Sequence, residues 1–60
     1  MTTYILSVDD GDAGQDYVFN SLEQALKTAK AKFKSGAFSV QVSHYDINES
    51  YVNDLWMERE

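Results

Sequence analysis

A single amphipathic segment, residues 21–36, constrains the fold of this chain more than any other part of its sequence. It opens with a predicted capping box, in which the Ser21 hydroxyl accepts from the backbone N–H of Gln24 and the Gln24 side chain reaches back to Ser21. Gly36 stands where a C-terminal cap belongs. Between these ends, apolar residues recur at helical spacing: Leu22, Ala25, Leu26, Ala29 and Phe33. The pattern predicts one helix with a single apolar face to bury.

Runs with a period of two flank this helix and predict strands. Residues 3–8 and 17–19 form two such runs, and the turn between them predicts a hairpin. Residues 38–45 form a third run and predict a half-buried strand. The inward positions of the first and third runs are Tyr4, Leu6, Val8, Phe38, Val40 and Val42.

The C-terminal segment, YVNDLWMERE, fits two structures. As a strand, it would put Val52 and Trp56 on one face and Tyr51, Leu55 and Met57 on the other. As a short helix, it would put Val52, Leu55 and Trp56 on one face. We favour the strand, because it gives residues 38–45 a hairpin partner. The sequence therefore predicts one α+β domain over residues 1–60, with the order ββαββ and a helix across one face of an antiparallel sheet.

The chain has 60 residues and no cysteine, so disulfide bonds and cysteine-based zinc sites are excluded. Its core must come from packing alone, aided by a partner or a second copy if packing falls short. No apolar run reaches the roughly 20 residues that span a bilayer. The N-terminal residues also lack the basic and long apolar regions of a signal peptide. These features predict a cytoplasmic protein.

The net charge of −5 is unevenly distributed along the chain. Residues 9–16 carry four acids and no base, and residues 46–60 carry five acids and one arginine. Residues 21–36 carry one acid and four lysines. The overall sign argues against direct binding to nucleic acid or to an anionic membrane, because phosphate neutralisation needs a basic face.

The acidic stretch 8–19, VDDGDAGQDYVF, resembles a calcium loop only superficially. An EF-hand needs a glycine at the sixth position and a glutamate at the twelfth. Counting from Asp10 gives Gln15 and Ser21 there, and counting from Asp9 puts Gly11 at the third position, where an oxygen ligand belongs. We therefore expect no metal and no cofactor. The stretch is either a solvated turn or a surface that meets a basic partner.

Catalysis has little support in the sequence, and we expect a protein that is not an enzyme. His44 is the only histidine, and its spacing places it at the end of the third strand without a nucleophile or a set of carboxylates around it. Lys27, Lys30 and Lys34 share one flank of the helix, either as a solvated face or as a docking ridge. Three aromatic residues either complete the core or form an interface: Tyr45, Tyr51 and Trp56.

The segment Ser21–Val40 resembles the helix-to-strand unit of a family of small proteins by which lytic phages inhibit bacterial RNA polymerase. The matching positions are Ser21, Leu22, Glu23, Ala25, Leu26, Ala29, Phe33, Phe38 and Val40. They cover about a third of the chain. In that family, arginines in the strand after the helix help to contact the polymerase, whereas residues 38–45 contain no arginine or lysine. The resemblance therefore implies a shared scaffold and a phage-encoded binder, but no shared functional residues.

Together these observations predict a protein-binding module, encoded by a phage or prophage, that occludes the basic site of a host nucleic-acid enzyme such as RNA polymerase. Its negative surface would comprise Asp9, Asp10, Asp12, Asp16, Asp46, Glu49 and Asp54, with Tyr51 and Trp56 as anchors. The alternative is a structural module that self-associates, for example as a homodimer, through a free sheet face or an edge strand.

Overall fold

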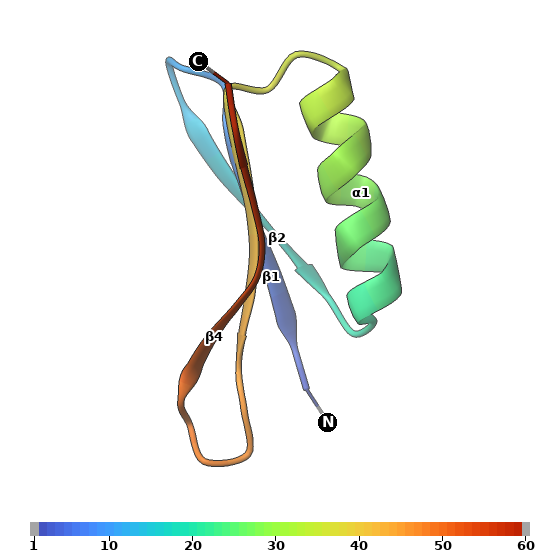
Figure 1. Cartoon of the computed structure of the whole chain (residues 1–60), viewed down its shortest axis with the longest axis vertical. Helices are drawn as coiled ribbons and strands as arrows, with labels where there is room; N and C mark the ends of the chain where they lie inside the picture. Colours follow the sequence, from blue (N-terminus) through green and yellow to red (C-terminus); the bar gives the residue numbers. More distant parts are fainter. Residues whose placement is uncertain (1, 60) are drawn as a thin grey trace.

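The computed structural model of the protein describes residues 2–59 and shows the predicted α+β fold. The elements follow the order β1 (Tyr4–Asp9), β2 (Gly14–Phe19), α1 (Leu22–Lys34), β3 (Ser39–Tyr45) and β4 (Tyr51–Glu58). The strands form one sheet in the order β2-β1-β3-β4, and each neighbouring pair is antiparallel. Helix α1 lies across one face of this sheet, and the other face has no second layer (Figure 1).

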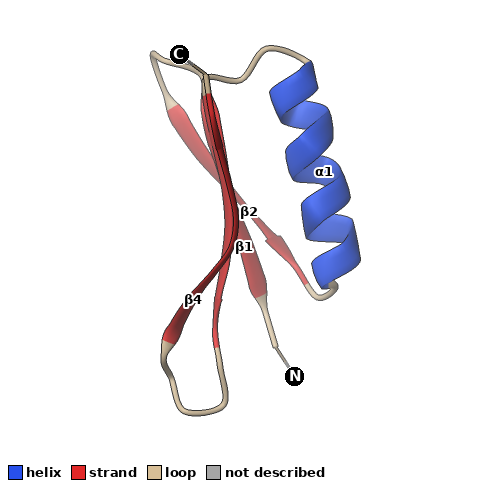
Figure 2. Ribbon diagram, in the orientation of Figure 1, coloured by secondary structure: helices blue, strands red, loops and turns tan. Residues whose placement is uncertain are grey.

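The strand prediction for the C-terminal segment is confirmed, because β4 pairs with β3 along its whole length. Two other boundaries differ from the prediction. Strand β2 begins at Gly14, so the first connection comprises only residues 10–13 (Figure 2). Of the four acids in residues 9–16, Asp9 lies in β1 and Asp16 in β2. Phe38 lies outside β3 and is exposed; its backbone N–H donates to the Asp9 carbonyl instead.

The core forms between α1 and the sheet face that the helix covers. The most deeply buried large side chains are Leu6, Val40 and Val42, and the helix adds Ala25 and Ala29. Small residues on the helix let its axis approach the sheet closely. Partly buried residues surround this centre: Tyr4, Tyr17, Phe19, Leu22, Leu26, Phe33, Leu55 and Met57.

Both ends of α1 are capped at the predicted residues, although at Ser21 only the first half of the predicted capping box is seen among the described residues. The Ser21 hydroxyl accepts from the N–H of Gln24 at 3.4 Å. At the other end, the N–H groups of Gly36 and Ala37 donate to the carbonyls of Phe33 and Lys32, which is the pattern of a Schellman motif. Gly36 has φ +117°, a conformation that side chains with a Cβ rarely adopt.

Replacing Gly36 by alanine is expected to lower the free energy of unfolding by about 1–2 kcal/mol, because the Cβ of alanine is sterically strained in the left-handed conformation. Urea denaturation followed by circular dichroism measures the change. Gly14→Ala is the matched control, since a Cβ there meets only the Val8 carbonyl oxygen at an ordinary 3.8 Å. Equal effects of the two substitutions would contradict this account of the cap.

Candidate protein-binding face

The sheet face opposite α1, called here the uncovered face, is the largest surface of the fold without a second layer. Cross-strand pairing fixes which residues share it, since side chains alternate between faces along each strand. From β2 to β4 its three full rows are Val18–Ile5–Ser43–Asn53, Asp16–Ser7–Gln41–Trp56 and Gly14–Asp9–Ser39–Glu58. Tyr45 and Tyr51 form a further pair beyond the first row.

A β-bulge in β4 decides which side chains of that strand reach the uncovered face. Val42 pairs with Leu55, but the next residue of β3, Ser43, pairs with Asn53, so Asp54 is the extra residue. The bulge shifts the alternation by one position. Tyr51 therefore shares the uncovered face with Trp56, and Val52 shares the helix side with Leu55. The predicted grouping of Tyr51 with Leu55 and Met57 is wrong for this reason.

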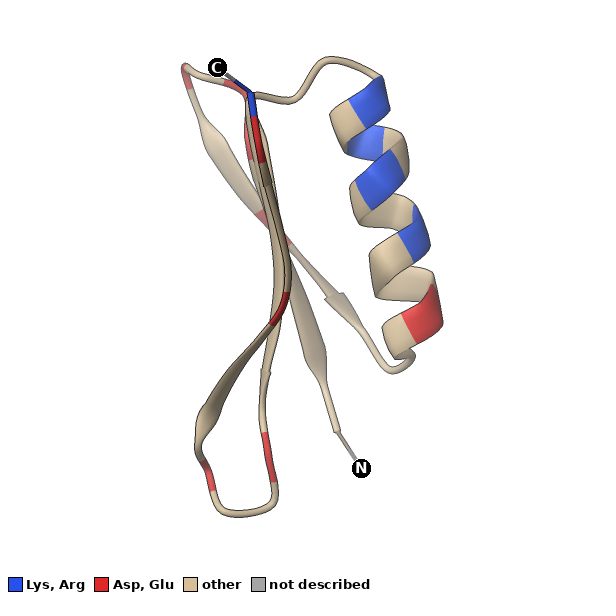
Figure 3. Cartoon of the chain, in the orientation of Figure 1, with Lys and Arg blue, Asp and Glu red and all other residues tan. Residues whose placement is uncertain are grey.

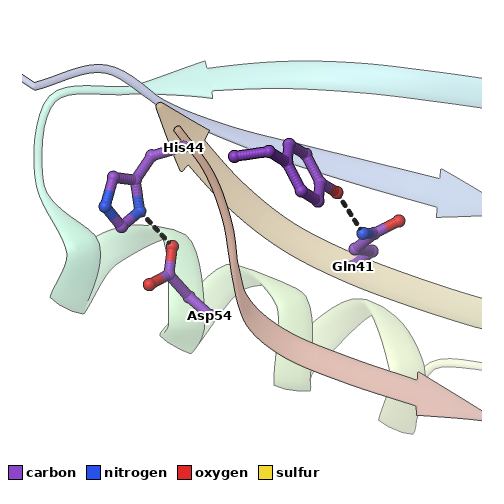
Figure 4. A network of polar contacts seen from close by, with 4 residues as sticks. Gln41, His44 and Asp54 are labelled. Carbon is purple, nitrogen blue, oxygen red and sulfur yellow. Dashed lines mark hydrogen bonds and ion pairs between the residues drawn. The ribbon is translucent and has the colours of Figure 1, made fainter. Parts of the chain in front are cut away.

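The bulge also turns Asp54 away from the predicted negative surface. Its carboxylate lies 2.6 Å from His44 Nδ1, and the two side chains are only 12% and 17% exposed (Figure 4). The His44 ring in turn packs edge-on against Tyr4, with 5.0 Å between the ring centroids. His44 is thus a rim residue of the helix-side core, as its strand position predicts, and Asp54 is its structural partner.

A double-mutant cycle is expected to show that His44 and Asp54 stabilise the fold as a pair. Asp54→Ala, His44→Ala and the double variant should give a coupling free energy of about 1–2 kcal/mol in urea denaturation, because the contact is a shielded, charge-assisted hydrogen bond. The cycle subtracts the separate loss of the Tyr4 contact. A coupling below about 0.3 kcal/mol would mean that the contact adds nothing to stability.

Three exposed aromatic side chains lie on the uncovered face, whereas most of the others surround the helix-side core. Tyr45, Tyr51 and Trp56 are 60%, 54% and 54% exposed, so they do not complete the core. The Tyr45 and Tyr51 rings meet edge-on, with centroids 5.7 Å apart. The Gln41 amide donates to the Tyr51 hydroxyl (Figure 4), which holds the ring along the sheet and across Ser43. This part of the face is therefore both apolar and ordered.

Two shallow hollows lie at opposite ends of the uncovered face. The first hollow has a volume of about 300 Å³ and lies next to the β1–β2 turn, over the second and third rows. Its lining includes Asp9, Asp12, Asp16, Gln41 and Trp56. The second, of about 460 Å³, is bordered by Thr3, Ile5, Tyr45 and Ile47, the last of which is 97% exposed. Thr2 and Asp46 complete the lining of the second hollow. The first hollow thus carries three acids, whereas the second carries one and is the more apolar of the two.

The structure divides the predicted acidic surface between the two ends of the molecule. Asp9, Asp10, Asp12 and Asp16 lie at the β1–β2 end, and three of them line the first hollow. Asp46 and Glu49 lie in the β3–β4 turn, at the other end of a domain 33 Å long (Figure 3). Of the two predicted anchors, Trp56 lines the acidic hollow and Tyr51 lies nearer the apolar one.

Two of these carboxylates hold turns. Asp9 Oδ1 accepts from the N–H of Gly11 at 2.7 Å, as expected for an aspartate that caps its own turn. Asp46 Oδ1 accepts from the N–H groups of Asn48 and Ser50 at 2.8 and 2.9 Å. Asp46 is therefore a turn-stabilising residue, whereas the side chains of Asp12 and Asp16 face the first hollow.

Basic side chains lie on the helix side of the domain (Figure 3). All four lysines are on α1, and Lys32 lies over the Tyr17 ring at 5.3 Å. Arg59 turns toward the C-terminal end of α1. Its Nε donates to the Ala37 carbonyl at 2.9 Å, and a second guanidinium nitrogen donates to the Phe33 carbonyl. The guanidinium also stacks on the Phe33 ring. The bases thus lie on the helix side and most acids at the ends of the sheet, with Glu23 on α1 and Asp54 beside His44 as exceptions.

Sequence reasoning missed three residues with polar side chains in the first hollow, Ser7, Ser39 and Gln41. The outward alternation of residues 38–45 carried the signal for two of them, since it marks serine and glutamine as facing away from the core. The role of Arg59 had no such signal, because its partners lie 22 and 26 residues away.

Neither a metal-ligand cluster nor a membrane-spanning helix is found in the described part of the chain. Over residues 2–59, no three His, Cys, Asp or Glu side chains converge as ligands for a metal ion. The one helix in this range is also too short and too polar to cross a membrane.

Comparison with models of protein families, with curated proteins and with solved structures gave no significant match to this chain. The resemblance to phage inhibitors of RNA polymerase therefore stays a prediction. The geometry of the domain is the basis for the function proposed below.

Proposed function

We propose that this chain is a non-enzymatic protein-binding module that uses its uncovered face to engage a basic surface of a partner protein. The observation that carries the proposal is the display of Tyr45, Tyr51 and Trp56, each more than half exposed, on one ordered face. Tyrosine and tryptophan are the residues most enriched among binding hot spots. They supply large contact areas at low cost in conformational entropy.

Electrostatics supports a basic partner. The acids of the first hollow adjoin Trp56, and the lysines lie on the other side of the sheet. The negative potential of these acids would attract a basic surface of the partner and orient it toward the uncovered face. The resemblance in residues 21–40 extends the proposal to a phage or prophage protein that acts in the host cytoplasm by covering the basic site of a nucleic-acid enzyme such as RNA polymerase.

The test is affinity capture from a bacterial lysate with three baits, analysed by mass spectrometry. One bait is the natural chain, one carries Tyr51→Ala with Trp56→Ala, and one carries Lys27→Gln, Lys30→Gln and Lys34→Gln on the helix. The proposal expects a nucleic-acid enzyme that is retained by the first and third baits and lost by the second. Retention by the second bait, or loss only with the third, would contradict it.

Ionic strength is expected to govern the rate of binding to the captured partner. Raising the salt concentration from about 0.1 to 1 M shortens the Debye length from about 10 to 3 Å. The association rate should then fall about tenfold or more, while the dissociation rate changes less. Surface plasmon resonance at several salt concentrations measures both rates. An association rate that does not depend on salt would rule out electrostatic attraction.

Self-association is the second candidate, favoured by the exposure of Val18 and Ile47 near the apolar hollow. A second copy would carry the same net charge of −5, which opposes association. Sedimentation equilibrium at high protein concentration distinguishes the two candidates. A dimer that Trp56→Ala abolishes would support self-association, whereas a monomer would exclude it.

A further inference from the structure

We infer that the first hollow of the uncovered face is a recognition pocket for an arginine side chain of the partner. The inference rests on the proposed function and deepens it, because it names the chemical group that the acidic end of the face would take. It follows from the walls of the hollow, from its hydrogen-bonding groups and from the distribution of charge around it.

The hollow has an aromatic wall and an acidic wall. Trp56 on the edge strand β4 provides the first, and Asp16 on the opposite edge strand β2, with Asp12 of the turn, provides the second. Three strand spacings separate the two edges, which gives about 14 Å between their backbones. This width leaves room for one long side chain between the indole and the carboxylates.

The residues that line the hollow carry mainly hydrogen-bond acceptors. They include Asp9, Asp12 and Asp16, of which Asp9 also accepts from the N–H of Gly11, and the hydroxyl-bearing Ser7 and Ser39. Gln41 donates through its amide nitrogen to Tyr51, which leaves its carbonyl oxygen as an acceptor. A group with several hydrogen-bond donors and no acceptor complements such a lining. The guanidinium group of arginine has five N–H donors and no acceptor.

The aromatic wall favours arginine over lysine. A guanidinium is planar and stacks on an aromatic ring while its edges reach carboxylates, whereas an ammonium group is a compact and strongly hydrated point charge. Within this domain the same chemistry is already used once, because the Arg59 guanidinium stacks on Phe33 at 4.3 Å and donates to two carbonyls. The lysines on α1 lie on the other side of the sheet and do not compete for the hollow.

The probe is a set of three short peptides, acetyl-Gly-X-Gly-amide, in which X is arginine, lysine or citrulline. Citrulline keeps the shape of arginine without its charge. Titrations of the full chain are followed by ¹⁵N–¹H correlation spectra and by the fluorescence of Trp56, the only tryptophan. We expect millimolar binding of the arginine peptide, at least threefold tighter than the lysine peptide, with shifts in residues 11–16 and in the Trp56 indole.

Two variants with the same change of charge locate the effect. Asp16→Asn should weaken the arginine peptide about two- to fivefold, and Glu49→Gln, at the other end of the domain, should leave it within 1.5-fold. Asp16 is chosen over Asp9 because the Asp9 carboxylate also holds the turn. Equal shifts with the citrulline peptide, equal weakening by the two variants, or shifts confined to other residues would overturn the pocket.

Failure of the pocket and failure of the proposed function give different results. If only the pocket is wrong, the arginine peptide gives no localised shifts, yet the Tyr51→Ala, Trp56→Ala bait still loses the captured enzyme. If only the proposed function is wrong, that bait captures the same proteins as the natural chain, and the peptide shifts remain in the hollow.

Discussion

Leu6→Ala is expected to remove a large share of the free energy of unfolding, about 2–5 kcal/mol. Leu6 is fully buried at the centre of the sheet, where its row continues into Tyr17 on one side and Val42 on the other. Truncation of a buried leucine costs about 2–5 kcal/mol, since it removes apolar contact and leaves a cavity. A chain of this length has about 3–9 kcal/mol of stability in total, at 0.05–0.15 kcal/mol per residue.

Circular dichroism during thermal and urea denaturation measures this effect. Ile47→Ala is the matched control, because it removes a similar aliphatic side chain that is 97% exposed. We expect the control to unfold within about 0.5 kcal/mol of the natural chain. If Leu6→Ala also stayed within that margin, the core described for the covered face would be incorrect.

Trp56→Ala is expected to weaken binding to the captured partner by about 30-fold or more, with little change in stability. Trp56 is 54% exposed in the isolated domain and lines the acidic hollow. Truncation of a hot-spot tryptophan costs about 2 kcal/mol or more, and 1.4 kcal/mol corresponds to a tenfold change in affinity. Isothermal titration calorimetry with the purified partner measures the loss.

Phe38→Ala is the control for this substitution, since Phe38 is an exposed aromatic residue that lies outside the sheet. It should change the affinity by less than threefold. An equal loss for both variants, or an unaltered affinity for Trp56→Ala, would show that the uncovered face does not carry the binding energy.

The secondary structure could be predicted because its signals are local. The capping serine, the apolar stripe and Gly36 define the helix within sixteen residues, and the alternation of residues 38–45 defines a strand within eight. The edge strand β2 was predicted too short. Gly14, Gln15 and Asp16 have little strand propensity, and they become a strand only because β1 pairs with them.

The arrangement of the candidate site was predictable only in part, because it depends on contacts between distant residues. The outward position of Trp56 needs the bulge at Asp54, and no glycine or proline in β4 marks that bulge. The same bulge brings Asp54 to His44, ten residues away. The separation of the acids into two ends follows from the hairpin geometry, which places the β1–β2 and β3–β4 turns at opposite ends of the sheet.

The most direct test of the central claim, that the uncovered face binds the partner, is an NMR map of the isotopically labelled chain in complex with the captured protein. We predict that the shifts fall on residues of this face, above all Ser7, Gln41, Tyr45, Tyr51 and Trp56, and that the exposed side of α1 stays unperturbed. Shifts confined to the lysine-bearing side of α1 would contradict the account.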